Sequence, residues 1–212
     1  MNNIKAIIFD LDGVICNTDQ YHYFAWKTLA DCLGIHFDEQ INHRLRGVSR
    51  MESLEIILGK HSFDYTDAEK QKLAEEKNSI YKGCLSALTP SDLSEDTKET
   101  LSVLRKRGYL LAIGSSSKNT RQILAQLGLN DFFDAVADGT QIEHSKPHPE
   151  VFLLAASMLG VSPEQALVIE DADSGIQAAH AGKFKVIGIY TPNSCPNTDI
   201  TIKRLSNLID IL

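Results

Sequence analysis

Two carboxylates stand close together early in the sequence. Asp10 and Asp12 follow the apolar run Ile4–Phe9 and precede Gly13. Residues two apart on an extended chain point to the same side, so both carboxylates are predicted to face one point. Two like charges this close are unfavourable unless a cation shares them or one of them is protonated. Taken alone, the pair also fits a plain turn after a strand, in which Gly13 permits a tight bend.

More polar groups follow other apolar runs. Glu170 and Asp171 end one such run, and Ser115 and Ser116 end another. Carboxylates that meet at one edge of a sheet suit Mg²⁺, which prefers hard oxygen ligands. Serine hydroxyls and N–H groups before a helix can hold an anion, and Lys146 adds a positive point charge. Together these groups are the parts of phosphoryl transfer through an aspartyl phosphate.

The apolar runs that position these residues are short and do not alternate with polar residues. This pattern is typical of strands buried on both faces of a parallel sheet. The runs are Ile4–Phe9, Tyr109–Ile113, Asp134–Ala137, Ala166–Ile169 and Val186–Tyr190.

Amphipathic helical stretches lie between the later runs, and each stops at a glycine, which often follows a helix C-terminus. They are Thr120–Leu127 before Gly128, Pro149–Leu159 before Gly160, and Ser174–Ala181 before Gly182. Alternating strands and helices predict an α/β fold with a doubly wound, Rossmann-like parallel sheet. Its binding crevice is expected at the carboxyl ends of the strands.

Residues 16–87 have a different pattern, with helical periodicity and no convincing strand. The helical stretches are Tyr21–Leu33, Met51–Leu58 and Thr66–Tyr81. We therefore predict an all-helical cap domain inserted after the first strand, above the crevice. The predicted domains are a catalytic core of residues 1–15 plus 88–212 and a cap of residues 16–87. The tail from Thr191 to Leu212 is expected to add a last strand and helix.

The composition argues against several classes of protein. The 212 residues carry a formal net charge of −7, which disfavours binding to nucleic acid or to an anionic membrane. The longest apolar stretch has roughly ten residues, short of a membrane span, and the N-terminus does not resemble a signal peptide. The cysteines have no CxxC spacing, so reduced thiols and a cytoplasmic location are expected. They are Cys16, Cys32, Cys84 and Cys195.

Four motifs resemble those of the haloacid dehalogenase superfamily in order and spacing. They are Phe9-Asp10-Leu11-Asp12-Gly13-Val14, Ser115, Lys146-Pro147 and Glu170-Asp171. The resemblance covers nearly the whole chain and implies a haloacid dehalogenase core with an inserted cap. It also implies one Mg²⁺ per chain, and the bond between Lys146 and Pro147 is often cis in this superfamily.

The same resemblance implies a role for each motif residue. Asp10 would be the nucleophile and a Mg²⁺ ligand, and Asp12 would be the general acid and base and give the metal its backbone carbonyl. Ser115 and Lys146 would hold the transferring phosphoryl group. Asp171, with Glu170 close by, would anchor Mg²⁺.

Further segments resemble the β-phosphoglucomutases within that superfamily. They are His22 to Trp26, Arg46-Gly47-Val48-Ser49-Arg50, Glu76-Lys77-Asn78, and the loop Ser115-Ser116-Ser117-Lys118-Asn119. The resemblance implies interconversion of β-D-glucose 1-phosphate and glucose 6-phosphate through β-glucose 1,6-bisphosphate. A Mg²⁺-dependent sugar-phosphate phosphatase with the same core is the alternative, and a non-catalytic sugar-phosphate binding protein is a remote one. A monomer is the default expectation.

A bisphosphate has two charged ends, so a mutase must hold one phosphate away from the nucleophile. Arg50 can grip that distal phosphate with a bidentate fork, although a plain surface arginine is the alternative. Ser116, Ser117, Lys118 and Asn119 are placed to bind the substrate from the core side. Gly47, Val48 and Ser49 are expected to approach the sugar closely, because Gly47 has no side chain.

Four other residues are proposed for the site with structural alternatives beside them. His22 is expected to position Asp12, although a lone helical histidine is usually structural. Trp26 fits the core of the cap better than a substrate contact, and Lys77 lies in a charged helix where a solvated lysine is ordinary. Thr18 resembles the hinge-side residue that tunes the proton of Asp12 in the mutases.

Three positions depart from the mutase pattern. Cys16-Asn17 stands where many relatives have Thr-Asp, Ser116 replaces the usual alanine, and Arg46 replaces a lysine found in some relatives. The changes at Ser116 and Arg46 keep the proposed chemistry intact. The change at Cys16-Asn17 leaves Thr18 in place but alters the linker between core and cap.

Overall fold

The computed structural model describes residues 3–46, 48–189 and 198–212. Within them the strands form one parallel sheet of six strands in the order β3-β2-β1-β4-β5-β6. The strands are β1 (Ala6–Phe9), β2 (Leu110–Gly114), β3 (Ala135–Ala137), β4 (Ala166–Glu170), β5 (Lys185–Ile189) and β6 (Ile200–Ile202). The predicted α/β fold with a doubly wound sheet is confirmed.

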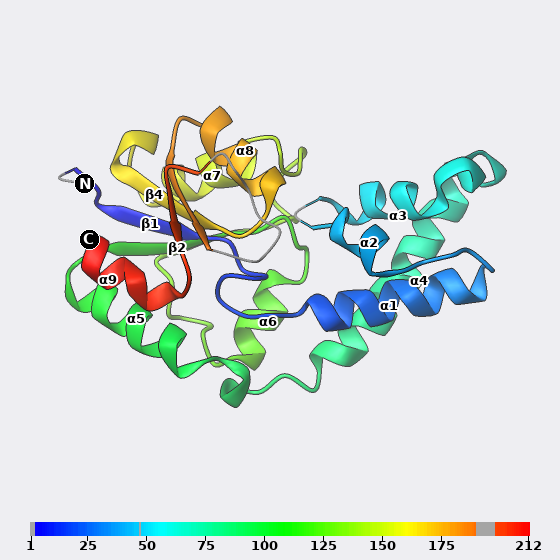
Figure 1. Ribbon diagram of the computed structural model, residues 1–212, viewed down its shortest axis with the longest axis horizontal. Coiled ribbons are helices and arrows are strands. Elements are labelled where there is room, and N and C mark those ends of the chain that lie inside the picture. The colour runs from blue at the N-terminus through cyan, green and yellow to red at the C-terminus, as the bar shows by residue number, and fades with distance from the viewer. Residues whose placement is uncertain (1–2, 47, 190–197) are drawn as a thin grey trace.

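Helices cover both faces of the sheet (Figure 1). Successive residues of a strand point to opposite faces, so Ile7 and Phe9 pack on one side and Ala6 and Ile8 on the other. The first face is covered by α5 (Glu95–Lys106), α6 (Thr120–Gln126) and α9 (Leu208–Ile211). The second is covered by α7 (Glu150–Met158) and α8 (Asp173–Ala181). This double cover explains why the strands are apolar without alternation.

The face under α7 and α8 is built from small residues. Ala112 and Ala166 of the sheet pack with Ala155 and Ala178 of the helices. At Gly114 a Cβ atom would lie 2.7 Å from Cδ1 of Phe152. The small side chains therefore let α7 approach the sheet closely at the end of β2, next to the predicted crevice.

The predicted glycines do follow the helices, but they act in two ways. Gly128 and Gly160 have φ values of 73° and 67°, which glycine adopts readily. Gly182 has φ of −81°, and the left-handed residue there is Lys183, with φ of 64°. The predicted glycine after α8 is therefore present, but its backbone is not left-handed. Glycine is needed at 182 for space, because a Cβ atom would lie 2.7 Å from Cε2 of Phe184.

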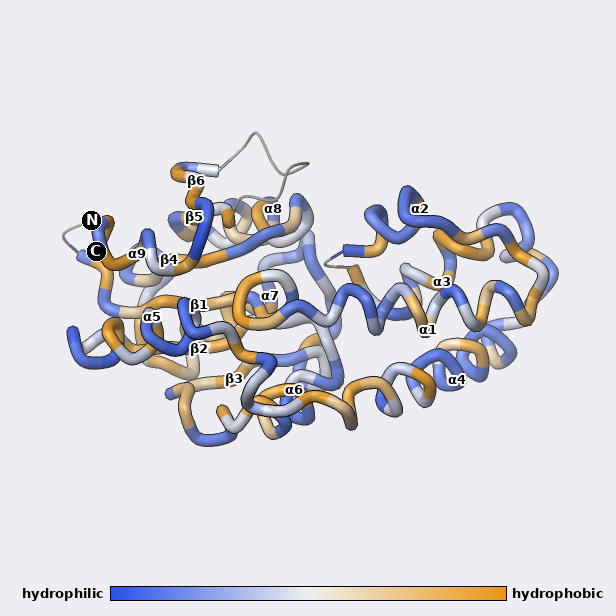
Figure 2. Tube along the Cα trace, turned by 60° about the horizontal axis from the view of Figure 1, so that its bottom comes forward, coloured by the Kyte–Doolittle hydropathy of each residue, from blue (hydrophilic) through white to orange (hydrophobic). Residues whose placement is uncertain are grey.

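The chain between β1 and β2 forms α1 (Asp19–Cys32), α2 (Glu39–His43), α3 (Arg50–Leu58) and α4 (Asp67–Leu85). These cap helices lie together at one end of the molecule, away from most of the sheet (Figures 1 and 2). They enclose an apolar cluster of their own that includes Trp26, Leu29, Leu54 and Leu58. The sequence predicted α1, α3 and α4 but gave no indication of the short helix α2.

Short 3-10 helices complete the described secondary structure: Gly59–Asp64, Pro90–Asp92, Pro163–Gln165 and Leu205–Asn207. β6 and α9 confirm the last strand and helix expected in the tail. Cys16, Cys32 and Cys84 are free thiols, and Cys195 lies outside the described residues. In the described part of the chain, no helix combines the length and apolar character needed to cross a membrane.

Candidate active site

The predicted polar residues gather at the carboxyl edge of the sheet. Asp10 follows β1, Ser115 follows β2, and Glu170 is the last residue of β4. β1 lies between β2 and β4, and the order of the strands along the chain reverses between β1 and β4. Such a reversal opens a crevice beyond the strand ends in doubly wound sheets. A cavity of about 930 Å³ lies there, lined by core and cap residues alike.

Lys146 holds two of the carboxylates together. Its Nζ lies 2.5 Å from Oδ1 of Asp10 and 2.7 Å from Oε2 of Glu170. The lysine side chain is 1% exposed. Burial acts to lower the pKa of Lys146, but the two carboxylates outweigh it and hold that pKa above its usual value. The lysine therefore stays positively charged beside Asp10.

Asp171 completes a group of three carboxylates with Asp10 and Glu170, whose oxygen atoms lie within 4.8 Å of one another. Two glycines make room for this group: a Cβ atom at Gly13 would overlap the carboxylate of Asp171, and one at Gly175 would overlap that of Glu170. Gly13 also has φ of 89°, as the predicted tight bend requires.

The three clustered carboxylates, Asp10, Glu170 and Asp171, carry more negative charge than their protein neighbours neutralise. Burial and the charge of Glu170 raise the pKa of Asp10 and of Asp171 above the usual aspartate range. Glu170 already accepts hydrogen bonds from the N–H groups of Asp171 and Ala172 through Oε1 and contacts Lys146 through Oε2. A hard cation such as Mg²⁺ fits this donor set, with Asp10 and Asp171 free to hold it and Glu170 orienting the neighbouring groups.

Asp12 lies half-buried beside Asp10 and is bound from the cap side. The Thr18 hydroxyl donates a hydrogen bond to Oδ1 of Asp12 and lies 2.9 Å from the hydroxyl of Tyr81 in α4. Burial raises the pKa of Asp12 to about 6, although the hydrogen bond from Thr18 and the charge of Lys77 act to lower it. A carboxyl group with a pKa near neutrality suits general acid and base chemistry.

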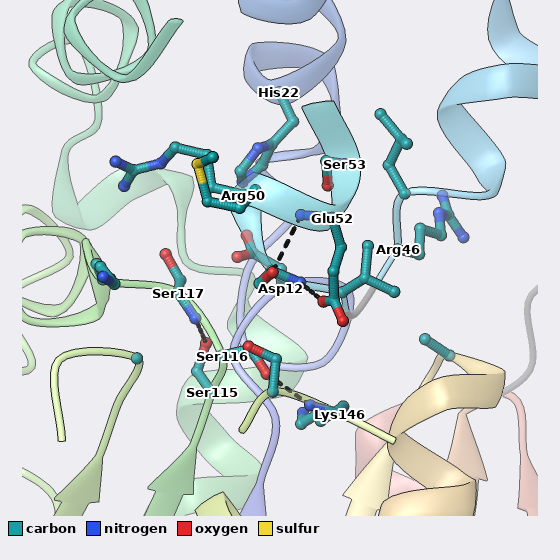
Figure 3. Close-up of a pocket in the computed structure, with 18 of the residues that line it drawn as sticks. Asp12, His22, Arg46, Arg50, Glu52, Ser53, Ser115, Ser116, Ser117 and Lys146 are labelled. Atoms are coloured by element: carbon teal, nitrogen blue, oxygen red, sulfur yellow. Dashed lines mark hydrogen bonds between the residues drawn. The ribbon is translucent and has the colours of Figure 1, made fainter. Parts of the chain in front are cut away.

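The loop after β2 forms a floor of hydroxyl and N–H groups. Oγ of Ser115 accepts a hydrogen bond from the N–H of Ser117 at 3.2 Å. Oγ of Ser116 accepts one from the N–H of Lys146 at 3.4 Å, so this serine joins its loop to the loop that carries Lys146 (Figure 3). The peptide bond between Lys146 and Pro147 is cis. Lys118 is exposed and lines the cavity beside Ser117.

Basic groups from the cap face this floor across the cavity. Figure 3 shows Arg50 and His22 on the opposite side of Asp12 from Ser115 and Lys146. Ser49 caps α3 through reciprocal hydrogen bonds with Glu52, which places Arg50 in the first turn. Among the described residues, the Arg50 guanidinium makes no hydrogen bond or ion pair. An unpaired guanidinium beside a cavity can bind an anion.

Lys77 is buried, with 2% of its surface exposed. The charged residues around it in the helix suggest a solvated lysine instead. Its Nζ lies 2.9 Å from Nδ1 of His22 and stands over the rings of Trp26 and Tyr81, 4.7 and 4.5 Å from their centroids. Burial and the charge of Arg50 lower the pKa of Lys77 to about 7. Burial, Lys77 and Arg50 lower the pKa of His22, which is therefore neutral.

The remaining predicted residues have mixed outcomes. Trp26 belongs to the apolar cluster of the cap and also lines the cavity, so both proposed roles apply to its position. Val48 and Ser49 line the cavity. Gly47 lies outside the described residues. Asn119 is buried, and its Nδ2 donates a hydrogen bond to Oδ1 of Asn78 in α4 at 2.9 Å.

A comparison with known families agrees with this geometry. The sequence profile of the haloacid dehalogenase-like hydrolases matches residues 4–183. The chain belongs to this family. The match runs from β1 through α8, so it includes every carboxylate at the sheet edge together with Lys146.

Relatives of this haloacid dehalogenase-like hydrolase include both a mutase and a phosphatase. It is 42% identical to the β-phosphoglucomutase of Bacillus subtilis, over 97% of this chain and 92% of the relative. It is 34% identical to the fructose-1-phosphate phosphatase of Escherichia coli, over 87% of this chain and 95% of the relative. The crystal structure of β-phosphoglucomutase from Clostridium difficile has a TM-score of 0.92 and 37% identity, covering 97% of this chain and 93% of that one.

Several residues of this haloacid dehalogenase-like hydrolase were missed as site residues in the sequence. Ser53 is 4% exposed and lines the cavity. It lies one helical turn after Arg50, and this spacing indicates that both residues are on the same face of α3. Arg46 pairs with Asp19 and places Nη1 3.9 Å from Oδ2 of Asp171. Tyr81 lies one turn after Lys77, but its contact with Thr18 depends on how α4 packs on α1.

Proposed function

We propose that this enzyme is a β-phosphoglucomutase, which interconverts β-D-glucose 1-phosphate and glucose 6-phosphate. The observation that carries the proposal is a cavity with a basic group at each end. Lys146 and Ser115 lie beside Asp10 at the core end, and the guanidinium of Arg50, which has no partner among the described residues, lies at the cap end. Two anion-binding ends match a sugar with two phosphate groups, because one phosphate reacts while the other is held.

Asp10 is the nucleophile in this proposal. Its carboxylate attacks the phosphorus of β-glucose 1,6-bisphosphate, an aspartyl phosphate forms, and the bond from phosphorus to the sugar oxygen breaks. Asp12 donates its proton to that leaving oxygen and later removes the proton from the sugar hydroxyl that attacks the aspartyl phosphate. Lys146 balances the negative charge on the oxygens of the transferring group. A pKa near 6 lets Asp12 act in both directions near neutral pH.

Three further parts belong to the proposal. Asp10, Asp171 and the backbone carbonyl of Asp12 would hold Mg²⁺, with Glu170 beside them; when bound, the ion neutralises charge on the phosphoryl oxygens. Thr18 and His22 position Asp12 from the cap side. Ser116, Ser117, Lys118 and Asn119 bind the substrate from the core, and Trp26, Val48, Ser49 and Lys77 do so from the cap.

The cap itself separates a mutase from a phosphatase. We propose that residues 16–87 form this cap over a core of residues 1–15 plus 88–212, and that its closure excludes water. Without water, the phosphoenzyme transfers its phosphoryl group to a sugar hydroxyl instead of hydrolysing. We further propose that the enzyme acts on sugar phosphates as a cytoplasmic monomer.

A Mg²⁺-dependent sugar-phosphate phosphatase is the second candidate. It is favoured by the 34% identity to a fructose-1-phosphate phosphatase, which extends over 87% of this chain. A phosphatase needs the core end of the cavity but has no need for Arg50 at the cap end. A non-catalytic sugar-phosphate binding protein would need neither the buried pair of Asp10 and Lys146 nor the cluster of three carboxylates.

A coupled assay distinguishes these activities. The enzyme is mixed with β-glucose 1-phosphate, Mg²⁺ and a trace of β-glucose 1,6-bisphosphate, and glucose 6-phosphate is followed beside free phosphate. A mutase produces glucose 6-phosphate with little free phosphate. Free phosphate as the main product would identify a phosphatase, and no turnover together with no phosphoenzyme would identify a binding protein.

A further inference from the structure

Two histidines on the loop that carries Lys146 lie beside Glu150, the first residue of α7. Nδ1 of His144 lies 3.1 Å from Oε2 of Glu150, and Nδ1 of His148 lies 3.7 Å from the same oxygen. The imidazole centroids are 4.7 Å apart. No role in the proposed phosphoryl transfer uses these three side chains.

The distances suit ligands of one metal ion. Ligand atoms at about 2.0–2.1 Å from a tetrahedral Zn²⁺ are roughly 3.3 Å from one another. The two pairs measured to Glu150 bracket that value, and one ligand atom from each of the three residues lies within 4.8 Å of the others. The rings of His144 and His148 are half-exposed, which leaves them room to rotate toward one ion.

Glu150 is held in place before any ion binds. It begins α7, and its two carboxylate oxygens accept hydrogen bonds from the N–H groups of Glu143 and His144, both at 2.9 Å. These bonds lower the pKa of Glu150, so the carboxylate is ionised. Each oxygen retains a further lone pair, which remains available to a cation. The turn between the histidines is closed by a hydrogen bond from the N–H of His148 to the carbonyl of Ser145, at 3.0 Å.

We propose that His144, His148 and Glu150 form a second cation site, which takes a transition-metal ion of the Zn²⁺ class and not Mg²⁺. Imidazole nitrogen is a good ligand for Zn²⁺, Ni²⁺ and Cu²⁺, whereas Mg²⁺ needs oxygen ligands in octahedral geometry. Three protein ligands leave the fourth tetrahedral position to water. Because Lys146 lies between the two histidines, a bound ion ties both ends of the lysine loop to α7.

The test measures metal binding and does not depend on the proposed activity. Zn²⁺ is titrated against a chromophoric chelator at saturating Mg²⁺, so that the carboxylate site is already occupied. The wild-type chain should bind one equivalent, and His148→Ala and His144→Ala should each weaken that binding at least about tenfold. His36→Ala is the matched control, because His36 forms an exposed pair with Asp38, 2.9 Å away, and no third ligand joins them among the residues that the structure describes. Its Zn²⁺ binding should equal that of the wild type.

Nitrogen-15 spectra identify the ligand atoms independently. The chain has seven histidines, and Zn²⁺ should shift the Nδ1 resonances of His144 and His148 alone. Unchanged Zn²⁺ affinity in both alanine variants, equal shifts in all histidine rings, or displacement of Zn²⁺ by Mg²⁺ would each overturn the proposal. Both alanine variants alter half-exposed side chains, and a circular dichroism melt verifies that they fold.

Discussion

Nδ2 of Asn119 donates a hydrogen bond to Oδ1 of Asn78, at 2.9 Å. Asn119 follows the serine loop after β2, whereas Asn78 lies in α4, one residue beyond Lys77. The bond therefore joins the core wall of the cavity to the helix that carries the buried cap lysine. It is formed with the cap helices facing the sheet edge, so it stabilises this arrangement of cap and core, which in the proposed function excludes water from Asp10.

Asn78→Leu should increase hydrolysis relative to isomerisation. Loss of one hydrogen bond costs about 1 kcal/mol, which corresponds to roughly a fivefold change in the population of the closed arrangement. We expect the ratio of free phosphate to glucose 6-phosphate in the coupled assay to rise by that factor. Ser79→Ala is the control, because its hydroxyl donates a hydrogen bond to the Glu75 carbonyl within α4, at 3.0 Å. An unchanged ratio in Asn78→Leu would contradict a closing role for this contact.

Asp10→Asn should abolish the phosphoenzyme. An amide keeps the shape of the side chain but is a poor nucleophile, and it removes the charge that faces Lys146. Intact-mass spectrometry after mixing with the bisphosphate and Mg²⁺ should detect the phosphorylated wild type and no phosphorylated variant. Asp173→Asn, an exposed substitution at the start of α8, should be phosphorylated like the wild type. A phosphorylated Asp10→Asn protein would exclude Asp10 as the nucleophile.

Gly175→Ala should damage both stability and activity. A Cβ atom at this position would overlap the carboxylate of Glu170, which holds Lys146 and two backbone N–H groups. We expect a loss of about 1–3 kcal/mol in unfolding free energy and a large drop in turnover. Gly83→Ala is the control: nothing lies within 4 Å of its added Cβ atom, and in α4 it should stabilise by about 0.5–1 kcal/mol. Urea denaturation of both variants measures the difference.

The sequence predicted the sheet because its strands are apolar on both faces, and the sheet determines which residues meet. Asp10, Ser115 and Glu170 come from distant segments, yet parallel strands bring their carboxyl ends to one edge. The helix α5 was not anticipated, although Ser94 and the buried Thr97, Thr100 and Leu101 have helical spacing. Its high content of charged residues obscured the apolar stripe.

Contacts between the cap and the core were less predictable than the motifs. Lys77 is buried because Trp26 and His22 of α1 contact it. No local sequence pattern in α4 indicates these contacts. Likewise, the hydrogen bond of Ser116 to the Lys146 N–H joins segments that are 30 residues apart. Local periodicity specifies an element and its apolar face, but the partners of a polar side chain depend on how the elements pack.

Lys77→Met should stabilise the protein most at low pH. In the folded protein the pKa of Lys77 is lowered to about 7 from its ordinary value of 10.5. Between these values the unfolded chain holds a proton that the folded chain lacks, so wild-type stability rises with pH across this window. Below pH 7 the folded protein bears the full cost of the buried charge, a few kcal/mol.

Methionine removes that cost, so the difference in melting temperature between Lys77→Met and the wild type should be large at pH 6. It should shrink steadily towards pH 10. The same comparison with Lys82→Met, an exposed lysine of the same helix, should give a difference that does not change with pH. A pH-independent difference for Lys77→Met would mean that Lys77 is not desolvated in solution.

Arg50→Ala should impair isomerisation far more than hydrolysis of a small phosphate monoester. Arg50 lies at the cap end of the cavity without a protein partner in the described residues, so its contribution depends on the distal phosphate. A bidentate charge-assisted contact contributes about 2–3 kcal/mol, which predicts a loss of roughly 30- to 150-fold in kcat/KM for β-glucose 1-phosphate. A monoester without a second phosphate should be hydrolysed at nearly the wild-type rate.

Two further variants separate charge and geometry in that result. Arg50→Lys keeps the positive charge but not the fork, so its kcat/KM should lie between those of Arg50→Ala and the wild type. Arg44→Ala removes an exposed cap arginine and should leave both reactions unchanged. If Arg50→Ala slows isomerisation and monoester hydrolysis equally, the guanidinium supports the shape of the cavity and does not bind the distal phosphate.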